Sequence, residues 1–147
     1  LSEQELVRYV KNLHDRKWYG ELCEKTTLSL YRTYKTSIKE ETFYENSSNS
    51  VIFFRARSNT LRLGWRNRFN GECVNCKVCD RDDEETQVHF IEECTRLHHI
   101  RVKYGMVGQS QEMALCLTGN LDVNKCKLFI GELWNFRKEI LKETIVL

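Results

Sequence analysis

Four residues suited to one metal ion lie close together in the middle of the chain. The stretch from Cys76 to Cys94 reads CKVCDRDDEETQVHFIEEC, which is the spacing Cys-x2-Cys-x9-His-x4-Cys. Three thiolates and one imidazole form a complete tetrahedral set for Zn²⁺, with the ligands Cys76, Cys79, His89 and Cys94. Because such a set leaves no open coordination position, the ion is expected to hold structure and not to activate water. The sequence therefore predicts one structural zinc knuckle of the CCHC type.

Other uses of these thiols remain open, because the chain has seven cysteines. They could be small buried apolar side chains. A disulfide framework is disfavoured by the odd number of cysteines and the lack of a signal-like N-terminus. Cys73 and Cys76 have the same spacing as Cys76 and Cys79, but the second pair leaves a shorter loop to His89, so Cys73 is interpreted as a spare thiol. Free thiols and a thiolate site favour a reducing compartment, nucleus or cytoplasm.

His89 and Cys94 have to reach the same ion from one short segment. Residues 86–93 suit a helix, in which positions five apart point about 140° away from each other. One regular helix cannot aim both side chains at one ion, so the helix is expected to end or tighten just before Cys94. The acidic run at 80–85 is interpreted as a solvated loop that should repel phosphate.

The rest of the chain favours a mainly α fold. It has 147 residues and 41% apolar content, which is enough to form a hydrophobic core. It has no proline, so long helices are rarely interrupted. We expect one small helical domain over 1–147, with N-terminal helices in 1–69, the zinc knuckle in 70–104 and C-terminal helices in 105–147. Besides the short helix at 86–93, six helices are expected. The first begins at a capping box at Ser2–Glu5, and the others run from Leu28 towards Ile38, from about Ser48 to Leu63, near 95–104, near 110–118, and from Asp122 onward.

The last expected helix carries a wide apolar stripe. Its members are Val123, Cys126, Phe129, Ile130, Leu133, Trp134, Phe136, Ile140 and Leu141. Such a stripe is typical of core, although a surface for a protein partner on this C-terminal helix stays open. The longest apolar run, Val51–Phe54, is far too short to cross a bilayer, so no membrane partner is expected.

A basic segment precedes the cysteines. Five arginines and no acid fall between Arg55 and Arg68, with Trp65 and Phe69 among and after them, although the net charge is only +2. Arginine makes bidentate hydrogen bonds to phosphate and stacks on bases, so a phosphate-binding face is expected. Its expected members are Arg55, Arg57, Arg62, Arg66, Arg68, Arg96, Arg101 and Lys103. In the alternative, the two aromatics are core and the arginines pair with Glu84, Glu85, Glu92 and Glu93. His98 and His99 are interpreted as one packed and one solvent-facing histidine.

The stretch from Leu28 to Arg101 resembles a segment of non-LTR retrotransposon reverse transcriptases, C-terminal to the polymerase. The matching elements are Tyr31-Arg32-Thr33-Tyr34-Lys35, then Arg57-Ser58-Asn59-Thr60-Leu61, Cys76 and Cys79, Glu85-Thr86-Gln87-Val88-His89-Phe90-Ile91-Glu92-Glu93-Cys94, and Arg101. The Glu-Thr-x-x-His-Phe core is the specific part, and the match covers about half of the chain.

This resemblance implies binding of element RNA or target DNA during target-primed reverse transcription. The chain shows neither the polymerase's paired aspartates nor a nuclease constellation, so no enzyme activity is expected. It begins at Leu1 without Met, which indicates a piece of a longer protein. A domesticated copy that serves as a protein-interaction module is the alternative function.

Overall fold

The computed structural model describes residues 1–35, 38, 40–117 and 121–146. Within these ranges the secondary structure is helical, apart from one isolated antiparallel bridge between Asn75 and Glu84, which confirms the mainly α prediction. By compactness the chain divides into Leu1–Thr42 and Phe43–Leu147, a boundary that the sequence does not predict. None of the helices in the described ranges combines the length and the apolarity needed to cross a lipid bilayer.

The first unit contains α1 (Glu3–Glu24), the 3₁₀ turn η1 (Thr26–Leu28) and α2 (Ser29–Tyr34). The predicted capping box starts α1: the Ser2 amide donates to Glu5 Oε2 at 2.7 Å, and the Glu5 amide donates to Ser2 Oγ at 3.2 Å. The bond from the Ser2 amide also lowers the pKa of the Glu5 carboxyl. The expected extension of α2 towards Ile38 includes residues 36 and 37, which lie outside the described ranges.

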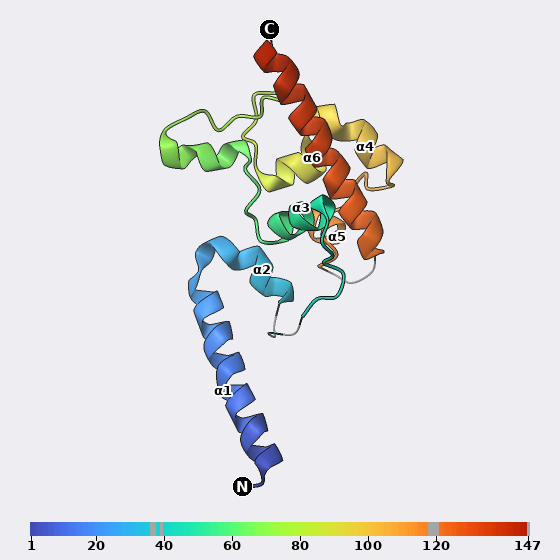
Figure 1. The fold of residues 1–147 in the computed structure, drawn as a ribbon. Coiled ribbons are helices and arrows are strands. Elements are labelled where there is room, and N and C mark those ends of the chain that lie inside the picture. The colour runs from blue at the N-terminus through green and yellow to red at the C-terminus, as the bar shows by residue number, and fades with distance from the viewer. Residues whose placement is uncertain (36–37, 39, 118–120, 147) are drawn as a thin grey trace. The chain divides into compact units, whose positions relative to one another are not determined.

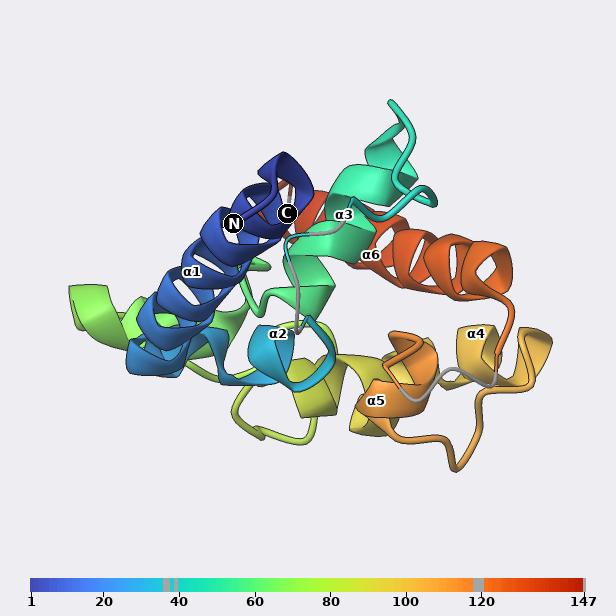
Figure 2. The same cartoon turned by 90° about the horizontal axis from the view of Figure 1, so that it is seen from below.

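The second unit is built on one long helix, α6 (Val123–Val146). Against it pack α3 (Ser48–Arg57), α4 (His98–Lys103), the four-residue α5 (Gln111–Ala114) and the π turn η3 (His89–Glu93), as Figures 1 and 2 show. The helix begins as predicted, because Asp122 Oδ1 accepts a bond from the Asn124 amide at 2.9 Å. Residue 118, the expected end of the preceding helix, lies outside the described ranges.

The apolar stripe of α6 forms the core of this unit. Cys126, Phe129, Ile130 and Leu133 are all fully buried, which confirms the core interpretation. Phe129 and Leu133 are therefore not available as a surface for a protein partner. His98 and His99 are both exposed, although the His99 ring contacts that of Phe136 with centroids 4.7 Å apart, so the predicted burial of one histidine of the pair is wrong.

Helix α3 is shorter than predicted and ends at Arg57, not near Leu63. Its start agrees with the prediction, because Ser47 Oγ accepts from the Ser50 amide at 3.2 Å. At the other end the Ser58 hydroxyl donates to the Phe54 carbonyl at 2.9 Å. The next residue, Asn59, has a positive φ of 56°, which ends the helix. The chain then turns into a short 3₁₀ segment, η2 (Gly64–Asn70), which carries part of the basic cluster.

Candidate metal centre and the basic surface beside it

Cys76, Cys79, His89 and Cys94 converge on one point. Their ligand atoms all lie within 4.8 Å of one another, and all four residues are buried. Cys79 Sγ is 3.5 Å from His89 Nε2, so this ring nitrogen faces the sulfurs. The predicted group is thus confirmed as a set that could hold one metal ion, whereas Cys73 is exposed and lies outside it. All seven cysteines are free thiols, as the metal interpretation requires.

The first two ligands are held by a small antiparallel turn. The Cys76 amide donates to the Asp83 carbonyl at 2.8 Å, next to the bridge between Asn75 and Glu84. Asp82, which directly precedes Asp83 at the base of the turn, has a φ of 60° and accepts a bond from Asn75 Nδ2 at 2.8 Å. The acidic run is therefore the connection that closes the ligand loop. It is exposed or half-buried as predicted, except at its last residue, which is buried.

The other two ligands are brought to the same side by a π turn. In η3 the Cys94 amide donates to the His89 carbonyl at 2.7 Å, a bond that spans five residues. A bond of this span places residue i+5 over residue i, which a regular α-helix does not do. Cys94 itself leaves the helix with φ −54° and ψ 116°. The predicted end of the helix before Cys94 is confirmed, but the turn widens there and does not tighten.

The electrostatics of the cluster favour a cation. The hydrogen bond that Cys76 Sγ receives from the Cys94 thiol is the main cause that lowers the pKa of Cys76 to about 3. Bonds from His89 and from the amides of Cys79 and Val78 also lower this pKa. The bond between Cys94 and Cys76, together with burial, raises the pKa of Cys94 above its usual range. The His89 pKa is raised, chiefly by its bond with Cys76. Buried thiolates this close repel one another, so a second one needs a positive charge between them. The donor set fits a divalent ion that takes thiolate and imidazole ligands.

The second ring nitrogen of His89 supports this fit. His89 Nδ1 is buried and has no hydrogen bond among the described residues. The carboxylate oxygen Glu93 Oε2 lies 3.7 Å from it, on the next turn. Metal-bound histidines usually give their second N–H to a carboxylate or carbonyl, which fixes the ring orientation. Glu93 is in the place to do so once Nε2 is held by a metal.

Arg101 belongs to the support of this centre and not to a nucleic-acid face. Its side chain is buried, with 3% of the residue exposed, and it donates to the carbonyls of Cys94 and Ile91. Burial lowers the pKa of its guanidinium. The prediction that Arg101 contacts phosphate is therefore corrected: the arginine satisfies carbonyls that the π turn leaves without helical partners.

Arg57 needs the same correction. It is also 3% exposed, and its guanidinium lies 4.9 Å from the ring centroid of Phe43 and 5.5 Å from that of Phe53. Its Nη1 donates to the Tyr44 hydroxyl at 2.9 Å. The last turn of α3 faces the core at this position, and stacked aromatic faces stabilise the buried cation.

The other six predicted members of the basic face keep contact with solvent. Arg55, Arg62, Arg68, Arg96 and Lys103 are exposed, and Arg66 is half-buried. Two are engaged in surface ion pairs, Arg68 with Glu84 and Lys103 with Glu132. The alternative in which the arginines pair with nearby acids thus applies to Arg68 and Glu84.

Phe69 is the exposed aromatic of this region. It is 72% exposed, so the interpretation as core does not apply to it, and its ring packs edge-on against the half-buried Trp65. Six residues of this segment line one shallow hollow, which we call the η2 face: Arg62, Leu63, Arg66, Asn67, Phe69 and Asn70. An exposed ring beside arginines is the arrangement on which unpaired bases stack.

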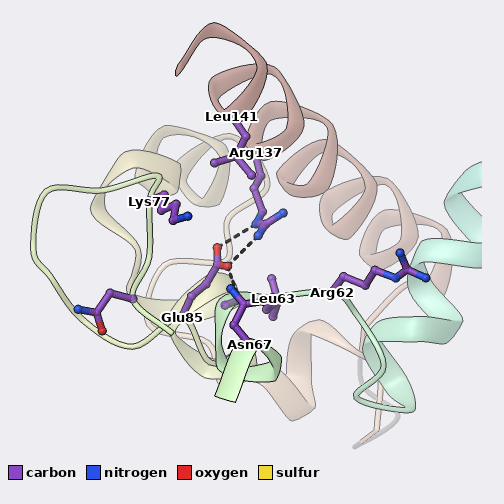
Figure 3. A pocket seen from close by; sticks show the side chains of 9 residues that line it. Arg62, Leu63, Asn67, Lys77, Glu85, Arg137 and Leu141 are labelled. Carbon is purple, nitrogen blue, oxygen red and sulfur yellow. Dashed lines mark hydrogen bonds and ion pairs between the residues drawn. The ribbon is translucent and has the colours of Figure 1, made fainter. Parts of the chain in front are cut away.

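One residue that connects these parts was missed by the sequence reasoning. The buried Glu85 carboxylate accepts two bonds from Arg137, from Nε at 2.8 Å and from Nη2 at 2.7 Å, and a third from the Gly64 amide at 2.7 Å (Figure 3). Glu85 thereby joins the metal loop to η2 and α6. A signal existed: Arg137 follows Ile130 and Leu133 at helical spacing, and a cation on an apolar face needs a buried acceptor.

The tight contact at Gly64 gives a first testable prediction. A Cβ atom there would lie 2.6 Å from the Val74 carbonyl oxygen, a backbone atom held by the Glu85 amide at 3.0 Å. We expect Gly64→Ala to lower the free energy of unfolding by about 1–3 kcal/mol, as overpacking does. Urea denaturation measures it. The control is Gly20→Ala in α1, where no described atom lies within 4 Å and the change should stabilise the helix. Equal effects at both glycines would contradict the packing described here.

Fold and site together define a mainly helical chain with a buried Cys₃His set and an arginine-rich surface joined to it. Comparison with known proteins finds no matching family model, no curated protein of significant similarity and no solved structure of significant similarity. The functional conclusion therefore rests on the chemistry of the site.

Proposed function

We propose that the chain is a non-catalytic, zinc-organised accessory domain of a retroelement-type protein that binds RNA or DNA. The observation that carries the proposal is the η2 face, where Phe69 is 72% exposed beside Arg62 and Arg66. An exposed ring offers a face on which an unpaired base can stack, and arginines around it suit a phosphate backbone.

Zinc is the metal that we assign to the Cys₃His set. Three sulfurs and one nitrogen at a single buried point favour a tetrahedral ion with borderline-soft character. Cys76, Cys79, His89 and Cys94 would hold the ion, which would supply only structural bonds. Its place in the proposal is to fix the loop whose last residue, Glu85, anchors η2 through the Gly64 amide.

Salt dependence tests the phosphate contacts. We expect the affinity for single-stranded RNA or DNA to fall steeply as salt rises, since each neutralised phosphate releases counterions. Arg66→Gln should weaken binding to all sequences alike and reduce the slope of log K against log salt by roughly 0.7. The matched control is Lys125→Gln, an exposed cation at the start of α6, which should leave the slope unchanged. A chain that binds neither RNA nor DNA at low salt overturns the proposal.

Phe69→Ala separates stacking from charge. Loss of one stacked base weakens binding by about 1–3 kcal/mol, but the salt slope should not change, because no phosphate contact is lost. Because the ring is largely exposed, the variant should unfold at the same urea concentration as the parent chain. An unaltered affinity would show that the ring does not contact bases.

A domesticated protein-interaction module is the second candidate, and one observation favours it. Helix α1 exposes Leu6, Val10 and Leu13, with exposed fractions of 52%, 44% and 48%. Their three- and four-residue spacing suits a partner helix laid along α1. Such binding would survive high salt and fail after Leu13→Lys, whereas the nucleic-acid contacts proposed above would show the reverse behaviour.

A further inference from the structure

A cavity of ≈ 460 Å³ lies between η2, the metal loop and α6. Leu63 and Leu141 give it apolar walls, and Arg62, Lys77 and Arg137 give it three cations. This volume is in the range of small-molecule sites, about 300–1,000 Å³, and the mixture of apolar walls with a few polar groups is typical of them. The cavity is outside the metal set, since none of the four ligands lines it.

The charge of the cavity favours an anionic occupant. Its carboxylate, Glu85, is already saturated by Arg137 and the Gly64 amide. Arg137 is fixed further by stacking on Trp134, with its guanidinium carbon 5.0 Å from the ring centroid. Lys77 reaches towards this pair, while Arg62 extends away from it (Figure 3). Neither Lys77 nor Arg62 has a side-chain partner among the described contacts, so both cations remain for a ligand.

The amides of the cavity leave acceptors for a base edge. Asn67 and Asn75 both line it, and each uses its Nδ2, one on the Cys73 carbonyl at 2.8 Å and the other on Asp82 Oδ1 at 2.8 Å. Their Oδ1 atoms are therefore the groups left to accept a bond. Carbonyl acceptors suit the exocyclic amino groups of adenine, cytosine and guanine.

The cavity continues into the hollow of the η2 face. The two share Arg62, Leu63 and Asn67 as lining residues. Arg62, which extends away from the Glu85–Arg137 pair in Figure 3, thus stands where one hollow passes into the other. A linear polyanion with flat side groups fits this layout better than an isolated metabolite does.

We propose that the cavity takes one unpaired nucleotide of a single-stranded nucleic acid. Its base enters between Leu63 and Leu141, its own phosphate lies on Lys77, the following phosphate lies on Arg62 where the cavity meets the η2 face, and the next base stacks on Phe69. This inference rests on the proposed nucleic-acid binding and adds to it a site that accepts single strands and rejects duplex. A paired base cannot enter, because its Watson–Crick edge is occupied and it is stacked on both sides.

The first test fills the cavity. Leu141→Trp should weaken binding of a single-stranded oligonucleotide of about eight nucleotides by roughly tenfold, the value of one lost base contact. The salt slope should stay the same in this variant. The control is Leu128→Trp, on the same helix at a position that is 52% exposed and does not line the cavity. Lys77→Gln should weaken binding and also reduce the salt slope by roughly 0.7, as one phosphate contact requires.

The second test uses a single nucleotide. Adenosine 5′-monophosphate added to the full chain should shift the NMR signals of Leu63 and Leu141, and in Leu141→Trp the shift of the Leu63 signal should be abolished. Ribose 5-phosphate carries the phosphate without the base, and we expect it to bind at least fivefold more weakly, because stacking and apolar contacts are lost.

The outcomes separate this inference from the function on which it rests. Single-strand binding that is unaltered by Leu141→Trp overturns the cavity and leaves the nucleic-acid function standing. Equal affinity for duplex and single strand also overturns it, as does equal binding of ribose 5-phosphate and the nucleotide. No binding of any oligonucleotide overturns the proposed function, and the inference with it.

Discussion

Cys94→Ser, or chelation of the metal, is expected to unfold the segment from about residue 70 to 104 and to loosen its contact with α6. The site is buried, and the binding free energy of a structural zinc, on the order of 10 kcal/mol, is folding free energy. The π turn also carries core residues: Phe90 and Ile91 are each 1% exposed, and the Phe90 ring packs edge-on against Trp134. Hydrogen exchange by mass spectrometry should show lost protection in this segment, while α3 and the first half of α6 stay protected by their shared core.

Cys73→Ser is the matched control for this prediction. Cys73 lies three residues before Cys76, undergoes the same chemical change and is exposed outside the metal set. It should keep one zinc per chain and unchanged protection. Purified protein without zinc by elemental analysis, or loss of the ion in Cys73→Ser and not in Cys94→Ser, would contradict the assignment.

Arg137→Met should be the most damaging substitution away from the metal. It leaves the Glu85 carboxylate buried without its counter-cation, with the Gly64 amide and a long contact from Cys76 Sγ as its remaining partners, and an uncompensated buried charge costs about 3–5 kcal/mol. Cys76 Sγ lies 3.9 Å from Glu85 Oε2, so the zinc affinity should fall as well. Urea denaturation and a competitive zinc titration measure the two effects.

Two further variants show whether charge is the cause. Adding Glu85→Gln to Arg137→Met should recover part of the lost stability, because a neutral amide tolerates burial better than a carboxylate. Lys103→Met breaks an ion pair on the surface, with Glu132, and should cost no more than about 1 kcal/mol. If Lys103→Met were as damaging as Arg137→Met, burial would not be the deciding factor.

The four residues that could hold a metal ion were predictable from the sequence because their spacing has few other uses. Cys-x2-Cys followed by a histidine and a third cysteine encodes local geometry, and the helix break before Cys94 follows from simple angles. The widening into a π turn did not follow, because a break at Cys94 can be made by several turns. The capping box of α1 and the core stripe of α6 were equally local and were predicted well.

The roles of the arginines were not predictable one by one. Arg57 and Arg101 have the same side chain as Arg62 and Arg66, and only the tertiary partners decide which are buried. The Arg57 guanidinium packs on three aromatic rings, two of them from the segment that precedes α3. Arg101 donates to a backbone carbonyl that the π turn leaves without a helical partner. The Glu85–Arg137 pair joins residues 52 positions apart, a distance over which a single sequence gives no pairing rule.

That separation along the chain has a consequence for synthesis on the ribosome. Glu85 and the four residues of the Cys₃His set emerge well before Arg137, by several seconds at about 5–20 residues per second. The nascent loop can bind its ion early, but its buried acid has no counter-cation until the last helix is made. A translation product that stops before Arg137 would therefore keep all four ligands and still fail to close around them, which would expose it to cellular proteases.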